Sequence, residues 1–215
     1  DSGKLLAIMD GEKITAIRTA AVTGIATKYL AKKDASIASF IGCGNQTLYQ
    51  IQAICHARKI KQIRLFDFDY TRCNILKTHF SEDYDVVICD DGEECIRGGD
   101  IITTLTPSVY GFVKHDWLKS SVHINAIGAD AQGKRELDLS VLDGVNLVVY
   151  DDWEQCSHSG EIQYVDYEDK KQPWLSLGDI VSGKEEVRGE QILFDATGLA
   201  VEDVVTARYI YEKVK

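Results

Sequence analysis

Short apolar runs alternate along the chain with segments in which apolar residues recur every three or four positions. The run from Asn146 to Tyr150 suits a strand that is buried on both faces of a parallel sheet, and the periodic segments favour amphipathic helices. The pattern predicts strands over residues 1–9, 36–41, 63–67, 85–89, 100–105, 122–127, 146–150 and near 191–195. It predicts helices over residues 15–30, 46–59, 70–80, 92–97, 114–119 and 201–211.

The order of these elements predicts an α/β fold. We expect a Rossmann-like, doubly wound and mostly parallel sheet that binds ligands at the carboxyl ends of its strands. Residues 31–195 would form this NAD-binding domain. Residues 1–30 offer a strand and a helix, too little to hold a substrate, so we expect the remnant of a substrate and dimerisation domain whose N-terminal part is absent. Residues 196–215 would form a C-terminal helix that returns towards that domain.

Composition narrows the class of partner. The formal charge of −10 argues against nucleic acid, because phosphate binding needs a basic face. No apolar run approaches the ~20 residues of a membrane span, so no membrane partner is expected. The six cysteines lack paired spacing and the five histidines lack metal-ligand spacing. We therefore expect free thiols in a reducing cytoplasm, and no metal site.

The residues around Gly42 carry the most specific chemistry in the chain. An apolar run ends in Gly42-Cys43-Gly44, a helical pattern follows, and a second apolar run ends in Asp67, 25 residues after Gly42. In a dinucleotide site the first glycine makes the tight turn from strand to helix and the second lets the backbone approach the pyrophosphate. The acid accepts hydrogen bonds from the ribose hydroxyls. An acid at this position favours NAD, because it would repel the 2′-phosphate of NADP.

The residues that follow this turn complete the predicted phosphate pocket. Asn45 and Gln46 lie where backbone N–H groups at the start of the helix would cap the phosphates. Thr47 stands where such motifs usually have a third glycine. We expect this threonine to hold the helix and the strand slightly further apart.

Several segments in the same order resemble the ornithine cyclodeaminase/mu-crystallin family. They run over essentially the whole chain: Arg18-Thr19-Ala20-Ala21, Ile41-Gly42-Cys43-Gly44-Asn45-Gln46, His123-Ile124-Asn125-Ala126-Ile127-Gly128-Ala129-Asp130, Gly133-Lys134-x-Glu136-Leu137-Asp138, Gly160-Glu161-Ile162 and Phe194-Asp195-Ala196-Thr197-Gly198-Leu199-Ala200-x-Glu202-Asp203. The resemblance implies NAD-dependent chemistry through an imine at the α-carbon of an amino acid. The amino-acid sequence around residues 40–46, 123–138 and 194–203 is similar to that of the archaeal type of alanine dehydrogenase. This enzyme interconverts alanine with pyruvate and ammonia.

The resemblance implies roles for three charged residues. The family has an acid-base aspartate at the position of Asp130, beside the nicotinamide; the alternative is the N-cap of a following helix. The family's arginine at Arg18 binds the substrate carboxylate with a planar fork of N–H groups and lies close to the cofactor; the alternative is an exposed helix residue. Lys134 resembles a cofactor-contacting lysine, and the alternative is a solvated surface lysine.

The resemblance also assigns other residues to the cofactor: Thr19, Thr106, Ile127, Gly128, Ala196 and Thr197. Thr19 would add a hydroxyl to the pyrophosphate, or fill a helix turn. Thr106 resembles a cofactor-contacting threonine, or forms a Thr-Pro turn. The family often has a serine where Ala196 stands, so a side-chain hydrogen bond to the nicotinamide is lost here. Thr197 or backbone groups would replace it.

The resemblance leaves other functions open beside alanine dehydrogenase. One is ornithine cyclodeaminase, which converts ornithine to proline and ammonia with catalytic NAD. Another is a non-enzymatic, crystallin-like nucleotide-binding protein, against which the acid at Asp130 argues. A third is ketimine or pyrroline carboxylate reduction, whose usual NADP is disfavoured by Asp67. In the enzymatic cases the partners are a small amino acid or keto acid and a second copy, bound as a homodimer through the N-terminal domain.

Overall fold

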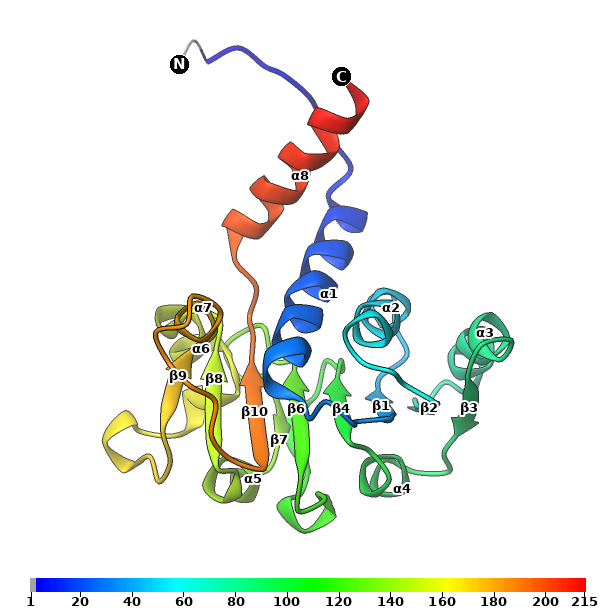
Figure 1. Ribbon diagram of the computed structural model, residues 1–215, viewed down its shortest axis with the longest axis vertical. Coiled ribbons are helices and arrows are strands. Elements are labelled where there is room, and N and C mark those ends of the chain that lie inside the picture. Colours follow the sequence, from blue (N-terminus) through cyan, green and yellow to red (C-terminus); the bar gives the residue numbers. More distant parts are fainter. Residues whose placement is uncertain (1–2) are drawn as a thin grey trace.

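A sheet of eight parallel strands runs through the molecule in the order β3-β2-β1-β4-β6-β10-β8-β9 (Figure 1). The computed structural model describes residues 3–215. The strands are β1 (Ile37–Ile41), β2 (Gln62–Phe66), β3 (Asp85–Ile88), β4 (Ile101–Thr104), β6 (Val122–Ala126), β8 (Leu147–Tyr150), β9 (Trp174–Ser176) and β10 (Gln191–Asp195). The prediction of a doubly wound parallel α/β sheet is confirmed.

Helices cover both faces of this sheet because successive strand residues point to opposite sides. Phe40 packs in a cluster with α2 and α3, whereas its neighbour Ile41 packs in a cluster with α4, α5 and α6. The register Phe40–Thr103–Asn125–Phe194 places Phe194, which packs with α1 and α7, on the same face as Phe40. One layer therefore holds α1 (Gly11–Leu30), α2 (Thr47–Ala57), α3 (Tyr70–Phe80) and α7 (Leu177–Val181), and the other holds α4 (Gly92–Arg97), α5 (Leu139–Gly144) and α6 (Trp153–Ser159).

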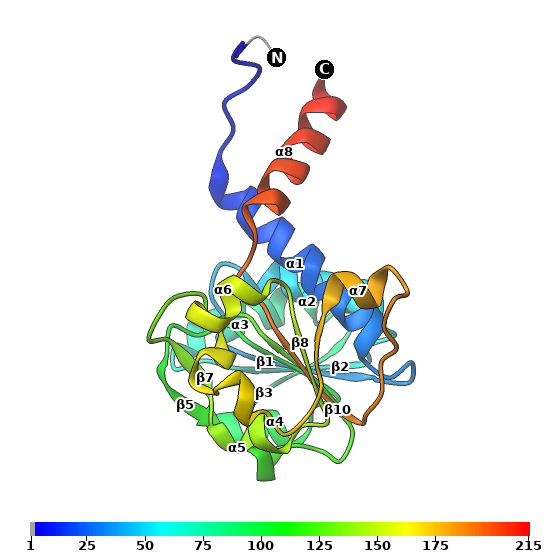
Figure 2. The ribbon, with the colours of Figure 1, turned by 90° about the vertical axis from the view of Figure 1, so that its left-hand side faces the viewer.

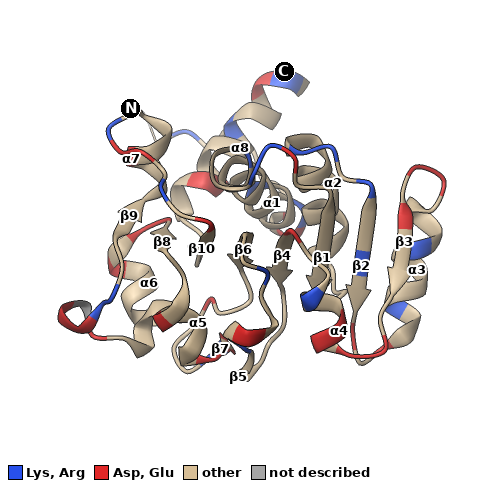
Figure 3. Cartoon of the chain, turned by 60° about the horizontal axis from the view of Figure 1, so that its bottom comes forward, with Lys and Arg blue, Asp and Glu red and all other residues tan. Residues whose placement is uncertain are grey.

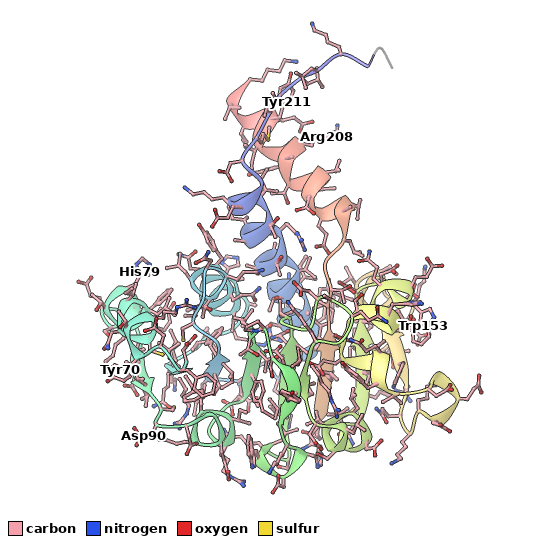
Figure 4. All side chains as sticks on the ribbon, turned by 180° about the vertical axis from the view of Figure 1, so that it is seen from behind. Tyr70, His79, Asp90, Trp153, Arg208 and Tyr211 are labelled. Carbon is pink, nitrogen blue, oxygen red and sulfur yellow. The ribbon has the colours of Figure 1, made fainter. Side chains whose placement is uncertain are left out.

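Two helices extend beyond the carboxyl edge of the sheet. The first half of α1 and all of α8 (Ala200–Val214) lie side by side there, as Figures 1 and 2 show. No residue of α8 is buried, and its labelled Arg208 and Tyr211 lie far from the sheet in Figure 4. Large apolar side chains of α8 stand in the open: Val201, Val204, Val205, Tyr209 and Val214.

The strand predicted over residues 1–9 is wrong for the residues that the structure describes. Residues 3–10 form an irregular arm, with Leu5, Leu6 and Ile8 exposed, and residues 1–2 lie outside the described part. A strand needs a hydrogen-bonded neighbour, and the arm has none within residues 3–215. The helix that follows begins at Gly11 rather than residue 15, because the Asp10 carboxylate caps it by accepting from the Glu12 N–H at 2.8 Å.

The other differences concern short segments. The helix predicted over 114–119 is only a 3-10 turn, η1 (His115–Trp117), because its last residues already pack against the core. Another 3-10 turn, η3 (Tyr167–Asp169), lies in a stretch for which no strand or helix was predicted. Several short elements were not predicted, although other strands and one helix of similar length were. These are β9, α5, α6 and α7, together with β5 (Val109–Val113), β7 (Arg135–Leu137) and the 3-10 turn η2 (Glu161–Tyr164). Strands β5 and β7 pair in a separate sheet.

Charged residues of both signs are spread along the chain (Figure 3). Lysines and arginines are dispersed over the described residues and interleaved with acids (Figure 3). Within residues 3–215 no helix combines the length and the apolar character that crossing a membrane requires. The described residues also contain no group of three or more histidine, cysteine, aspartate or glutamate side chains placed to hold a metal ion.

Candidate cofactor and substrate site

Backbone hydrogen bonds join the ends of neighbouring strands into one continuous edge. The Gly42 N–H donates to the Phe66 carbonyl, and the Leu105 N–H donates to the Ile41 carbonyl. The same edge continues where the Ile127 N–H donates to the Thr104 carbonyl and the Ala196 N–H to the Ala126 carbonyl. Residues that follow β1, β2, β4, β6 and β10 are therefore neighbours, although they lie far apart in the sequence.

The turn after β1 requires glycine at its first position. Gly42 has a φ of +93°, and a side chain there would come within 2.8 Å of the Leu105 carbonyl oxygen. A side chain at Gly44 would meet nothing within 4 Å, so this side of the turn is open. Thr47, at the place of a third glycine, is fully buried, and its hydroxyl donates to the Gly42 carbonyl at 2.8 Å. This threonine ties the start of α2 to the turn.

Asp67 points at the glycine turn. It follows the last residue of β2, and its Oδ2 accepts from the Cys43 N–H at 2.7 Å while its Oδ1 accepts from the Asp69 N–H at 2.8 Å. These two bonds hold the carboxylate at the carboxyl edge, where an adenosine ribose would lie in a Rossmann fold. The Cys43 thiol is buried between the two glycines, and burial raises its pKa, which disfavours the thiolate that a nucleophile needs.

The start of α2 offers polar groups without protein partners. The Gln46 Oε1 atom is buried and accepts no hydrogen bond from any described residue, and no side chain caps the helix at this end. Asn45 is exposed and donates to Glu12 at 3.3 Å. A cavity of about 690 Å³ adjoins both residues between the N-terminal ends of α1 and α2.

Asp130 lies past the end of β6 and forms an ion pair. Its Oδ1 is 2.5 Å from the Lys134 Nζ, and half of its side chain is exposed. Irregular chain and then β7 follow it, so Asp130 does not cap a helix. The Lys134 side chain is therefore paired with Asp130 and is not surrounded by solvent alone. An i, i+4 spacing was a usable sign of this pair, which sequence reasoning passed over.

Arg18 is held by two acids of α8. Its Nη1 lies 3.2 Å from the Glu202 Oε2 and its Nε 3.1 Å from the Asp203 Oδ1, with 13% of its side chain exposed. Arg18 is thus not the exposed helix residue of the alternative interpretation, and two of the five N–H groups of its guanidinium are used. The Thr19 hydroxyl donates to the Thr15 carbonyl within the same helix at 2.7 Å, which is the helix-filling role.

Thr106 and Gly128 share a buried partner that sequence reasoning missed. The Thr106 N–H and hydroxyl both donate to the Glu136 Oε1, at 2.6 and 2.7 Å, and the Gly128 N–H donates to its Oε2 at 2.9 Å. The neighbouring Ile127 is buried at the end of β6. Only the position of Glu136 in a family motif hinted at a role.

Asp151 holds the loop after β10. Its Oδ2 accepts from the Thr197 and Gly198 N–H groups at 2.9 and 2.8 Å. Ala196 is buried against the end of β6. The structure therefore brings the predicted residues after β1, β2, β4, β6 and β10 to one edge, and Arg18 reaches the same loop from α1. Their contacts with cofactor and substrate stay predictions.

The sheet order and the glycine turn place the chain in the Rossmann-like class of NAD-binding folds. The family model described as "Ornithine cyclodeaminase/mu-crystallin family" matches residues 1–215, and the chain belongs to this family. The membership that the motifs predicted is confirmed.

Individual relatives place the chain more closely. An alanine dehydrogenase of Archaeoglobus fulgidus is 37% identical over 221 residues, which cover 99% of this chain and 67% of that protein. The solved structure of an archaeal alanine dehydrogenase dimer with bound NAD matches with a TM-score of 0.90 and 36% identity, over 98% of this chain and 67% of that one. The Δ1-pyrroline-2-carboxylate reductase of Thermococcus litoralis, solved with NADH and L-proline, matches with a TM-score of 0.92 and 33% identity, over 99% of this chain and 68% of that one. The chain thus spans about two thirds of the length of these relatives.

Proposed function

We propose that this chain is the cofactor-binding part of an NAD-dependent alanine dehydrogenase, which interconverts alanine with pyruvate and ammonia. The observation that carries the proposal is the common edge on which Asp67, the glycine turn and the Asp130–Lys134 pair all lie. The similarity to the alanine dehydrogenase of Archaeoglobus fulgidus supports the choice of substrate.

The residues at the glycine turn fit NAD. Gly44 leaves its side of the turn open to a pyrophosphate, and Asp67 is already directed at this turn. The buried Gln46 Oε1 lacks a donor among the described residues, and a cofactor hydroxyl would supply one. NAD bound there would accept the hydride that leaves the α-carbon of the amino acid with the electron pair of the C–H bond.

The proton steps fall to Asp130. Oxidation at the α-carbon turns the amine into an imine, and the proton lost from nitrogen passes to the Asp130 carboxylate. Water then adds to the C=N carbon: the protonated carboxyl group returns its proton to the nitrogen, and the carboxylate so formed takes a proton from the water. The same group next protonates the departing nitrogen, which leaves as ammonia while the hydroxyl proton of the adduct returns to the carboxylate. Lys134 holds the carboxylate in place through its 2.5 Å ion pair.

Arg18 would bind the substrate carboxylate with the part of its guanidinium that the protein leaves open. Glu202 and Asp203 use Nη1 and Nε, and among residues 3–215 the Nη2 group has no recorded partner. The two acids orient the fork and leave three of its five N–H groups, one on Nη1 and two on Nη2, for a substrate carboxylate.

An assay of the full-length protein with several substrates tests the proposal. We expect NADH to be oxidised when pyruvate and ammonia are both present and not when ammonia is omitted. Ammonia release from ornithine with no net change in NADH would instead assign a cyclodeaminase. NADH oxidation by Δ1-pyrroline-2-carboxylate without ammonia would assign a reductase.

We also infer a homodimer in the cytoplasm. The dimeric state of the archaeal alanine dehydrogenase structure and the exposed apolar side chains of the arm and α8 support this inference. The six cysteines are free, as expected in a reducing compartment. Sedimentation velocity on the full-length protein should give twice the chain mass, and a monomer at micromolar concentration would remove the dimer from the proposal.

A further inference from the structure

Three carboxylates lie completely buried below the carboxyl edge of the sheet. Glu136, Glu161 and Asp195 have no exposed surface. Burying a charged group is costly unless its oxygens are hydrogen-bonded. The donors that these oxygens receive therefore show what the three side chains hold together.

Asp195 and Glu161 link β10 to β7 through η2. The Asp195 Oδ2, at the end of β10, accepts from the Ile162 N–H in η2 at 3.0 Å. Glu161 begins η2, and its two oxygens accept from the Glu136 and Leu137 N–H groups of β7 at 2.6 and 3.1 Å. Each carboxylate thus fixes the backbone of the next element.

The carboxylate of Glu136 reaches the candidate site. Glu136 accepts from the N–H and the hydroxyl of Thr106, in the loop after β4, and from the N–H of Gly128, after β6. A side chain at Gly128 would lie 2.5 Å from the Glu136 Oε2, so the two loops have no slack. Asp130 comes two residues after Gly128.

The loop of Asp130 is also held from its far side by η2. The Gly133 N–H donates to the Gln163 side chain at 3.1 Å, and the Tyr164 hydroxyl donates to the Lys134 carbonyl at 3.1 Å. The 3-10 turn η2, which contains Glu161, is therefore hydrogen-bonded to the Asp130 loop as well as to β7.

From this geometry we infer that Glu136 is a positioning residue for the reaction: its carboxylate sets the Thr106 loop and the Asp130 loop relative to each other. Glu161 and Asp195 hold the strand of Glu136 in place. The inference rests on the proposed function, because it takes Thr106 and Asp130 as parts of the site. A carboxylate suits this role because all its partners are donors, whereas an amide would turn its own N–H₂ group towards one of them.

The chain of carboxylates also makes the site sensitive to pH. Burial raises the pKa of Glu136, that of Glu161 to about 8 and that of Asp195 to about 7, while the donated N–H groups oppose the shift. The other titratable groups around Asp195, Asp151 and Cys156, add no positive charge. Both oxygens of Glu161 already accept from N–H groups, so a proton on either would face a donor, whereas the Asp195 Oδ1 has no partner among the described residues and can take a proton without this conflict. The loops should therefore loosen as Glu161 is protonated when pH falls from about 8 to 7.

The test compares Glu136→Gln with a matched control in the full-length protein. The control is Asp100→Asn, because Asp100 lies at the amino edge of the same sheet and likewise accepts from two backbone N–H groups, Ser36 and Ile37, at 2.9 and 3.0 Å. We expect Glu136→Gln to lower kcat by about tenfold or more, since a misplacement of 1 Å can cost ~10²-fold. We expect a smaller loss of NADH affinity, and no change of kcat in the control.

A second variant guards against failure to fold. In Glu161→Gln the fall of turnover between pH 8 and 7 should flatten, whereas wild type and Asp100→Asn keep it. Equal kcat in Glu136→Gln and the control overturns the positioning role, and so does an unchanged pH profile in Glu161→Gln. NADH titration of the wild type distinguishes failure of the proposed function from failure of this inference. If NADH does not bind, the proposed function is wrong. If NADH binds, the wild type turns over and Glu136→Gln is unimpaired, only the positioning role of Glu136 is wrong.

Discussion

Replacing Asp130 with asparagine in the full-length protein is expected to lower kcat by ~10²-fold or more, the size typical of a lost acid-base group. The amide keeps the shape of the side chain but cannot take up the proton of the amine. NADH affinity should change little, because Asp67 and the glycine turn stay intact. Steady-state kinetics in the direction of pyruvate amination, with NADH fluorescence titration beside it, measure both quantities.

The matched control for this variant is Asp138→Asn. Asp138 lies in the same region but caps α5, where its Oδ1 accepts from the Ser140 N–H at 2.9 Å. Asparagine caps a helix about as well as aspartate, so this substitution should leave both the stability and kcat nearly unchanged. A turnover number in Asp130→Asn equal to that of the control would take Asp130 out of the mechanism.

NADH is expected to bind the full-length protein ~10²-fold more tightly than NADPH, because like charges brought together cost several kcal/mol and each 1.4 kcal/mol is a factor of ten. The charge in question is the Asp67 carboxylate, held at the glycine turn by the Cys43 and Asp69 N–H groups. Asp67→Asn removes the charge and keeps an oxygen for the Cys43 N–H. The variant should bind the two cofactors within about tenfold of each other in fluorescence titrations.

Asp85→Asn provides the control for charge alone. Asp85 starts β3 at the opposite edge of the sheet, and its carboxylate accepts from the Gln62 side chain at 2.7 Å. Its substitution makes the same change in net charge and should leave the preference for NADH intact. Equal affinity of the wild type for NADH and NADPH would overturn the assignment of Asp67 as the ribose-binding acid.

The parts of the site that sequence reasoning found are those built from short-range pattern. Gly42 needs its positive φ because the chain turns there, and Asp67 ends the next strand, so their spacing carries the geometry. The parts that it missed depend on contacts between distant loops. Glu136 binds Thr106, 30 residues away, and Asp195 binds η2, 33 residues away. A single sequence shows that such acids exist but not that they are buried together.

Arg18 is another residue whose contacts the sequence did not predict. Its partners Glu202 and Asp203 lie 184 and 185 residues away, and no periodicity joins α1 to α8. The sequence showed these residues only as parts of family motifs, and the ion pairs that occupy two of the arginine's nitrogens became visible only when the two helices lay together.

The amino-acid sequence by itself determined the alternation of strands and helices, the glycine turn and the acid that faces it, because burial periodicity and turn geometry are local properties of the chain. Tertiary structure alone decided which loops meet at the edge of the sheet, which carboxylates are buried, and that residues 3–10 have no strand partner in the part of the chain that the structure describes. Hydrogen-bonded neighbours and desolvation come from segments far away in the sequence, and only packing brings these segments together.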